Sequence, residues 1–262
     1  MRAHTPEVRQ GDGGSSPPAP RGLRRARSEV LARSIGAWRR VAGDSQPRHL
    51  VGVTKRLMLD YGYVRSLRGG APVQGRGEPV PWYTFPAIEY LRGLDLSGRR
   101  VFEFGAGNST LFWQAHAEEV VSVETDPEWY EQLAPRIAGN GTLILCRDRD
   151  EYLARITEHD PFDVIVVDGL WRKPTARAAL EHLAPGGMIV LDNADWFPHS
   201  HAVLRQAGLV EIDFHGLGPI GRYAWTTSVF LDRTADFWST AGPPDPIGGI
   251  RPPEILAVDA ED

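Results

Sequence analysis

Hydrophobic residues in the middle of the chain alternate between short β-type runs and longer helical patterns. Runs rich in valine and isoleucine predict strands at residues 101–104, 120–123, 142–146, 163–167 and 187–191. Apolar positions at helical spacing predict helices at residues 85–91, 109–117, 127–138, 149–157, 173–183 and 200–207. Strands that are apolar on both sides are typical of a parallel sheet covered by helices on both faces. The pattern therefore predicts an α/β fold of Rossmann-like type.

The last two predicted strands break this alternation. They lie at residues 209–214 and 224–232, and the connection between them is too short for a crossover helix. Parallel neighbours need such a crossover, whereas antiparallel neighbours do not. We therefore expect a seven-stranded, mostly parallel sheet with an antiparallel C-terminal hairpin at its edge.

The segment before the first strand has a different organisation. Apolar spacing predicts helices at residues 24–41 and 49–67, the second broken at Gly62, and a mobile loop rich in Gly and Pro at residues 69–81. The expected division is a disordered basic arm (1–23), a helical extension or lid (24–80), a main domain (81–234) and a C-terminal tail (235–262). The leading helices have two interpretations, a cover for an acceptor pocket or a packing and homodimer surface.

Charge is unevenly distributed along the chain. Residues 1–50 contain ten arginines and four acidic residues, a net charge of +6, whereas the whole chain carries −5. Such an arm can tether a protein to a polyanion, but this segment lacks interleaved aromatic residues and a nucleic-acid-binding motif. We interpret it as an extension, and the acidic remainder of the chain argues against a nucleic-acid substrate.

Composition limits the compartment and the class of protein. No apolar run approaches the roughly 20 residues that span a bilayer, and no apolar segment follows the N-terminal arginines as in a secretory signal. The single cysteine, Cys146, excludes an internal disulfide and is expected to be a small buried hydrophobe. These features predict a cytoplasmic protein without a membrane partner.

The first strand of the series leads into a glycine-containing turn. Residues 101–110 read VFEFGAGNST, so Glu103 precedes Gly105 and Gly107, and a second acid, Glu124, ends the next apolar run. Glycines permit a tight turn and close approach to a ligand, and an acid at the end of the second strand can accept hydrogen bonds from ribose hydroxyls. These positions predict a nucleoside-binding pocket.

The same residues narrow the kind of nucleoside. A dinucleotide fingerprint has a third glycine where this chain has Thr110, and Glu103 would repel a pyrophosphate while suiting an ammonium group. S-adenosylmethionine offers a ribose, an adenine and an ammonium, and no phosphate. The motif resembles that of class I S-adenosylmethionine-dependent methyltransferases, with Ser109 in place of the last glycine. The resemblance extends over about residues 82–233.

Ligands of open α/β sheets bind outside the carboxyl ends of the strands. The residues at these ends are therefore the candidate cofactor contacts. Glu103 and the glycine loop are expected around the methionine part, Glu124 at the ribose, Asp148 at the adenine amino group, and the aromatic segment at residues 81–86 over the cofactor. Thr84 has two interpretations, a hydrogen bond to the cofactor carboxylate or a helix cap. The predicted cofactor-binding residues are Tyr83, Thr84, Glu103, Gly105, Ala106, Gly107, Asn108, Ser109, Glu124, Thr125, Asp148 and Asp168.

The reactive chemistry is expected at the ends of the fourth and fifth strands. Asp168 ends one of them, and Asp192 and Asn193 end the other. These three side chains form a hard-oxygen set suited to Mg²⁺. The arrangement resembles the catechol, caffeoyl-coenzyme A and sugar O-methyltransferases, a resemblance that implies a metal held by Asp168, Asp192 and Asn193. In methyltransferases without a metal, acids at these positions orient the cofactor or the acceptor.

Without a metal, the reaction requires a general base. His199 follows the fifth strand and His215 follows the sixth, so each is a candidate, and Asp168 is an alternative. The function predicted from sequence is methyl transfer from S-adenosylmethionine to an oxygen of a small molecule or natural product. Two alternatives stay open: a methyltransferase whose arm recruits RNA or a peptide, and a non-catalytic binding protein with the same fold.

Overall fold

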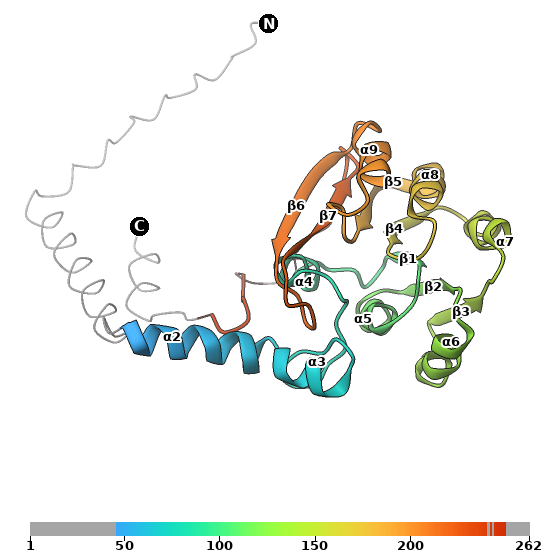
Figure 1. Cartoon of the computed structure of the whole chain (residues 1–262). Helices are drawn as coiled ribbons and strands as arrows, with labels where there is room; N and C mark the ends of the chain where they lie inside the picture. The colour runs from blue at the N-terminus through green and yellow to red at the C-terminus, as the bar shows by residue number, and fades with distance from the viewer. Residues whose placement is uncertain (1–45, 240–241, 243, 250–262) are drawn as a thin grey trace, which may run out of the picture. The chain divides into compact units, whose positions relative to one another are not determined.

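Seven strands form one sheet in the order β3-β2-β1-β4-β5-β7-β6 (Figure 1). The pairs β3-β2, β2-β1, β1-β4 and β4-β5 are parallel, whereas β7 is antiparallel to both β5 and β6. This topology confirms the predicted α/β fold with a C-terminal antiparallel hairpin. The strands are β1 (Arg100–Phe104), β2 (Glu119–Glu124), β3 (Gly141–Leu145), β4 (Phe162–Val167), β5 (Leu183–Leu191), β6 (Val210–Gly216) and β7 (Trp225–Leu231).

Helices cover both faces of this sheet. In Figure 1, α4 and α5 lie on one side of it, and α7, α8 and α9 lie on the other. The helices are α4 (Phe85–Arg92), α5 (Asn108–His116), α6 (Pro127–Leu133), α7 (Arg149–Ala154), α8 (Arg172–His182) and α9 (Pro198–Arg205).

Two apolar layers fill the space between the sheet and its helices. Alternate strand residues separate into them: Val101 packs in the layer with α4 and α5, while Phe102 and Phe104 pack in the layer with α7 and α8. Successive strand residues point to opposite faces, so a strand buried on both sides contributes to both layers. Burial of each large apolar side chain stabilises the fold by roughly 1.5–3 kcal/mol, which fixes β1, β2, β4 and β5 as a rigid platform.

Two predicted helices end earlier than expected. The pattern predicts a helix over 127–138, but α6 ends at Leu133 and a 3-10 turn follows at Ala134–Arg136. Pro135 explains this difference, because it has no backbone N–H to continue α-helical hydrogen bonding. Likewise α7 ends at Ala154 and tightens into a 3-10 turn at Arg155–Glu158.

The leading segment forms α2 (Gln46–Lys55), a π-helical turn (Arg56–Asp60) and α3 (Tyr63–Gly69). The predicted break at Gly62 is confirmed, because Gly62 adopts φ 78° and thereby separates the helical turns.

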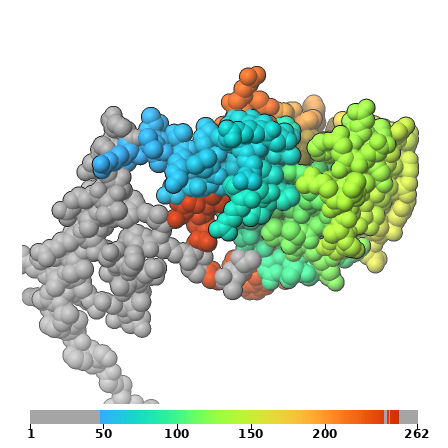
Figure 2. Space-filling view, turned by 90° about the horizontal axis from the view of Figure 1, so that it is seen from below, coloured from blue at the N-terminus to red at the C-terminus, as the bar shows by residue number. Residues whose placement is uncertain are grey.

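The following segment, expected to be a mobile loop, is closed by a β-bridge between Val73 and Pro79. Asn108 Nδ2 at the start of α5 donates to the Pro72 carbonyl over 2.6 Å. Figure 2 accordingly shows the cyan surface of α3 and this segment against the green surface of α5.

The structure describes residues 46–239, 242 and 244–249, and residues 51–249 form one compact unit. The predicted basic arm and the predicted helix at residues 24–41 lie outside the described residues. Within the described part, no helix is both long enough and apolar enough to cross a membrane.

Candidate active site

The glycine loop joins the end of β1 to the start of α5. Gly105 has φ 95°, and a side chain there would bring Cβ to 2.8 Å from the Gly169 backbone. Its N–H donates to the Val123 carbonyl of β2 over 2.9 Å, and the Gly107 N–H donates to Thr110 Oγ1 over 3.0 Å. The loop is therefore held tightly between β2 and the segment that follows β4, as its glycine content predicts.

Glu103 lies fully buried beneath this loop. One carboxylate oxygen accepts hydrogen bonds from Thr110 Oγ1 at 2.5 Å and from Ser122 Oγ at 2.8 Å, while the other has no hydrogen-bond partner. Burial raises the pKa of Glu103 to about 7 against the opposing effect of the neighbouring hydroxyls. An unpaired buried carboxylate oxygen suits a positively charged donor. Glu103 is not itself among the residues that line the cavity at this loop, so its contact with the ammonium of S-adenosylmethionine stays a prediction.

Glu124 holds the end of β2 against the glycine loop. One carboxylate oxygen accepts from the Thr125 and Asp126 N–H groups at 2.6 and 2.9 Å, and the other accepts from the Ala106 N–H at 3.0 Å. Each carboxylate oxygen has two lone pairs, so the first oxygen is fully used and the second keeps one acceptor site, which suits one ribose hydroxyl. Glu124, Thr125, Ser109 and the glycine loop line one cavity of about 560 Å³, a volume within the usual range for small-molecule sites.

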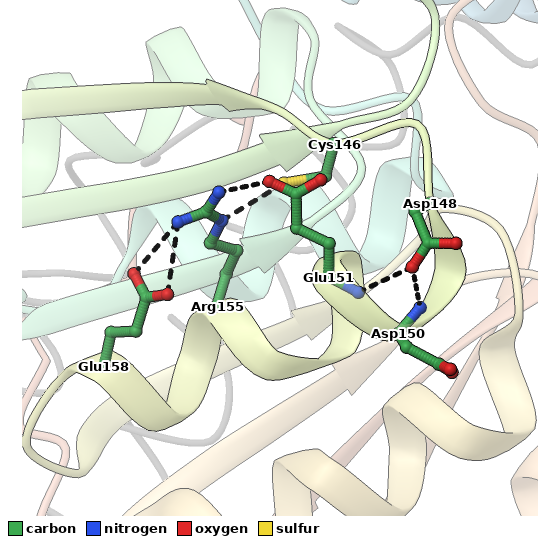
Figure 3. A network of polar contacts seen from close by, with 6 residues as sticks. All are labelled: Cys146, Asp148, Asp150, Glu151, Arg155 and Glu158. Carbon is green, nitrogen blue, oxygen red and sulfur yellow. Dashed lines mark hydrogen bonds and ion pairs between the residues drawn. The ribbon is translucent and has the colours of Figure 1, made fainter.

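The adenine end of the predicted cofactor site is built differently from the sequence expectation. Asp148 Oδ1 accepts from the Asp150 and Glu151 N–H groups at 2.8 and 3.0 Å and thus caps α7 (Figure 3). The residue does not line the cavity beside Glu124. A contact between its other carboxylate oxygen and adenine stays a prediction.

Cys146 belongs to the same network. It is buried, and its Sγ accepts from Arg155 Nε at 3.4 Å, while Arg155 also pairs with Glu151 and Glu158 (Figure 3). Burial raises the pKa of the Cys146 thiol, which disfavours the reactive thiolate. The structure thus agrees with a packing role for this cysteine.

The predicted roles of the aromatic segment before α4 need correction. Thr84 is fully buried, and its hydroxyl donates to the Phe214 carbonyl of β6 at 3.0 Å. It makes no helix cap, and this bond contradicts a contact with the cofactor carboxylate. Tyr83 is also fully buried and does not line the cavity beside Glu124, whereas Trp82 is half exposed and lines a second cavity. Packing of the segment against the sheet edge decided which side chain faces outward.

Arg172, at the start of α8, connects the segments that follow β4 and β5. Its guanidinium donates to the side chain of Asp168 at 2.8 Å and to the backbone carbonyl of Asp192, and it lies 4.2 Å from the centre of the Phe197 ring. Burial raises the pKa of Asp168, and the Arg172 charge opposes that effect. The sequence pattern did not predict that Arg172 joins these two segments.

Asp192 is buried at the end of β5. Its Oδ1 accepts from Thr227 Oγ1 at 2.6 Å and from Trp225 Nε1 at 3.0 Å. Burial raises the pKa of Asp192 well above its usual value, and the nearby Asp168 charge adds to this shift. The two carboxylic acids predicted from the strand ends thus lie together, as the sequence predicts.

The arrangement of these acids does not fit the predicted Mg²⁺ site. A guanidinium already pairs with Asp168 and reaches the Asp192 carbonyl, and two donors occupy Asp192 Oδ1. Asn193, the third predicted ligand, adopts φ 53°, an uncommon conformation that occurs most often for glycine and asparagine. Arg172 therefore supplies the positive charge that the metal was expected to supply.

This arrangement leads to a prediction about chelation. We expect the methyl transfer predicted from the sequence to be unchanged, within about twofold, after dialysis against EDTA, because Arg172 neutralises the Asp168 charge. The measurement is S-adenosylhomocysteine release with and without added Mg²⁺. A large loss of activity that Mg²⁺ restores would contradict the internal-cation interpretation.

The two predicted histidine bases lie away from these acids. His215 on β6 is exposed, and its Nδ1 is 2.8 Å from Thr226 Oγ1. His199 is exposed in the first turn of α9. Neither lines the cavities that contain Asp168 and Asp192. Strand and helix orientation, which sequence position alone does not give, directs both imidazoles elsewhere.

A second cavity of about 330 Å³ adjoins the first and shares Asp168 and Arg172 with it. Asp192 and Asn193 also line it, and its other lining residues are all aromatic: Trp82, Trp196, Tyr223 and Trp225. Sequence reasoning missed the last three, although Trp196 lies only four residues after Asp192. The two cavities therefore meet at Asp168 and Arg172.

The comparisons with known proteins agree with this arrangement. Residues 102–194 match the family model for the methyltransferase domain. The matched segment contains Glu103, the glycine loop, Glu124, Asp168 and Asp192, so both cavities draw residues from the matched segment. Among the curated proteins, none matches the sequence at a significant level.

Several solved structures are similar in part. The N-methyltransferase NodS from Bradyrhizobium japonicum with S-adenosyl-L-homocysteine is 14% identical, with 66% of this chain and 98% of NodS covered at a TM-score of 0.42. Cofactor-bound Rv0187 from MTB is 17% identical, with 73% and 99% covered at a TM-score of 0.47. Precorrin-6y C5,15-methyltransferase from Geobacter metallireducens is 15% identical, with 55% and 85% covered at 0.43. Similarity at this level assigns no activity to the chain.

Proposed function

We propose that this protein is an S-adenosylmethionine-dependent methyltransferase that methylates an oxygen of a small molecule. The proposal rests on one observation: the two cavities share Asp168 and Arg172. One cavity is lined by the glycine loop and Glu124, and the other ends at Asp192 beneath aromatic walls. A cofactor in the first cavity and an acceptor in the second would have their reacting atoms side by side.

The cofactor role rests on three groups of the chain. The unpaired oxygen of Glu103 would accept from the ammonium, and the free acceptor site of Glu124 would accept from a ribose hydroxyl. The tight turn at Gly105 would let the backbone approach the cofactor. When bound, S-adenosylmethionine supplies an electrophilic methyl group on a sulfonium centre.

The acceptor role rests on Asp192. Its raised pKa makes this carboxylate a stronger base than an ordinary aspartate, and its Oδ1 is fixed by Thr227 and Trp225. Asp192 would take the hydroxyl proton of the acceptor as the acceptor oxygen bonds to the methyl carbon. The bond from that carbon to the sulfonium sulfur would break, and S-adenosylhomocysteine would be the leaving group. Arg172 would position this residue by binding its backbone carbonyl and would balance the charge of Asp168.

Calorimetry with the purified full chain tests the cofactor assignment. We expect S-adenosylmethionine and S-adenosylhomocysteine to bind and NAD not to bind, because the buried Glu103 carboxylate would repel a pyrophosphate. Glu124→Gln should weaken binding by about 10-fold to 150-fold, the value of a hydrogen bond to a charged group. Glu128→Gln, on the exposed surface of α6, is the matched control and should bind normally. Binding of NAD alone would overturn the proposal.

A further inference from the structure

The second cavity has an unusual set of walls for a surface site. Trp82, Trp196 and Tyr223 are each about half exposed, although large aromatic side chains are usually buried. The Trp196 and Tyr223 ring centres are 5.6 Å apart, and those of Tyr223 and Trp225 are 6.1 Å apart. Several aromatic faces are therefore available to one molecule in the cavity.

The innermost wall is held in place by its own contacts. Trp225 is almost fully buried, and its Nε1 donates to Asp192 Oδ1 at 3.0 Å. A Cβ on Gly218 would approach this indole to 2.2 Å, and one on Gly221 would approach it to 2.6 Å. The backbone of the β6–β7 connection thus packs closely against the Trp225 indole and holds it in a fixed position relative to Asp192.

The charges that line the cavity are unbalanced. Asp168 and Asp192 contribute two carboxyl groups, whereas Arg172 is the one cationic residue among the described residues that line the cavity. Arg172 pairs directly with the side chain of Asp168, and with Asp192 only through the backbone carbonyl. The Asp192 carboxyl accepts hydrogen bonds from a hydroxyl and an indole, and no described side chain forms an ion pair with it. A positive charge on a ligand would be attracted both by this carboxylate and by the aromatic faces.

We propose that the acceptor is a small organic cation, a hydroxyl compound whose ammonium or quaternary nitrogen lies among Trp82, Trp196 and Tyr223. The inference rests on the proposed function, because it names the class of molecule that enters the second cavity. Aromatic faces attract cations through the ring quadrupole, and quaternary ammonium compounds are recognised by such aromatic cages in proteins. The cavity volume of about 330 Å³ suits a molecule of one ring with its substituents.

Two molecules of the same shape test this inference. The probe is 3-hydroxyphenyltrimethylammonium, and the matched neutral compound is 3-tert-butylphenol, which has the same hydroxyl and the same bulk without the charge. Each is titrated into the full chain saturated with S-adenosylhomocysteine. We expect the cation to bind at least about tenfold more tightly than the neutral phenol, because several aromatic faces and one carboxylate attract its charge together. The preference should decrease as salt concentration rises.

Variants in the aromatic wall test whether the cationic nitrogen of the ligand lies against these side chains. Trp196→Leu and Tyr223→Leu keep apolar bulk and remove an aromatic face, so each should weaken binding of the cation by about twofold to fivefold. Neither should change the affinity for 3-tert-butylphenol by a similar factor. Trp238→Leu is the control, because Trp238 is 74% exposed and does not line the cavity.

The outcomes separate this inference from the function on which it rests. If S-adenosylhomocysteine does not bind, the proposed function fails. If S-adenosylhomocysteine binds and the cation shows no preference over the neutral phenol, or neither compound binds, the inference is overturned while the proposed function stands. Equal loss of both compounds in the leucine variants would also overturn the cation site, because it would indicate a purely apolar wall.

Discussion

Asp192→Asn is expected to lower the turnover number by about 10²-fold to 10⁴-fold, the usual contribution of general base catalysis. The asparagine oxygen can still accept from Thr227 Oγ1 and Trp225 Nε1, so the local structure should be retained. The amide cannot take a proton from the acceptor. The affinity for S-adenosylhomocysteine should stay within about twofold, since Asp192 does not line the cofactor cavity.

The pH dependence of kcat/KM is a second test of Asp192 as the general base. Burial raises the pKa of Asp192, so part of the population holds a proton that must be lost before the residue can act as a base. The kcat/KM of the wild type should therefore rise with pH until Asp192 is ionised, and this ascending limb should be absent from Asp192→Asn. The measurement uses the best acceptor from a panel of small hydroxyl compounds. Asp150→Asn, on the exposed face of α7, is the control. Turnover of Asp192→Asn within about threefold of the wild type would exclude the base role.

Glu103→Gln is expected to weaken cofactor binding by about 10-fold to 150-fold, because a charged acceptor for the ammonium is lost. The same change should make the protein less sensitive to high pH. The pKa of Glu103 is about 7 in the folded protein, because the carboxyl is buried, against 4.5 for the ordinary group. Between these two values the folded state holds a proton that the unfolded state has lost. The stability that this protonated residue contributes is fully present below about pH 4.5 and is lost as pH rises through 7.

Urea unfolding at pH 5 and pH 8 measures the effect. Between these pH values, Glu103 should lower the wild-type free energy of unfolding by about 2–3 kcal/mol, and the glutamine variant should lack this decrease. The difference between the two pH values is the relevant quantity, because any packing cost of the substitution is common to both. Glu128→Gln should follow the wild type. An identical pH dependence in Glu103→Gln and the wild type would show that Glu103 is ionised throughout.

Local rules were sufficient for the main features of the fold. Runs of valine and isoleucine can be satisfied only by strands buried on both faces, and the absence of room for a helix before β7 requires an antiparallel neighbour. The acids Glu103, Glu124, Asp168 and Asp192 could be located in the same way, because parallel strands bring their carboxyl ends to one edge. The helix cap at Asp126 was also predictable, since capping is a contact within three residues.

Contacts between distant segments decided the rest of the site. The hydroxyl of Thr84 donates to β6, 130 residues away, and Arg172 reaches the carbonyl of Asp192 across two loops. The aromatic wall combines Trp82, before the sheet, and Trp196, after β5, with residues from the last hairpin. The sequence by itself determined the sheet, its topology and the edge where the acids gather, because periodicity and turn length are local properties. Only the tertiary structure decided that Arg172 takes the place expected for a metal and that aromatic residues line the second cavity, because both depend on side chains that meet through packing.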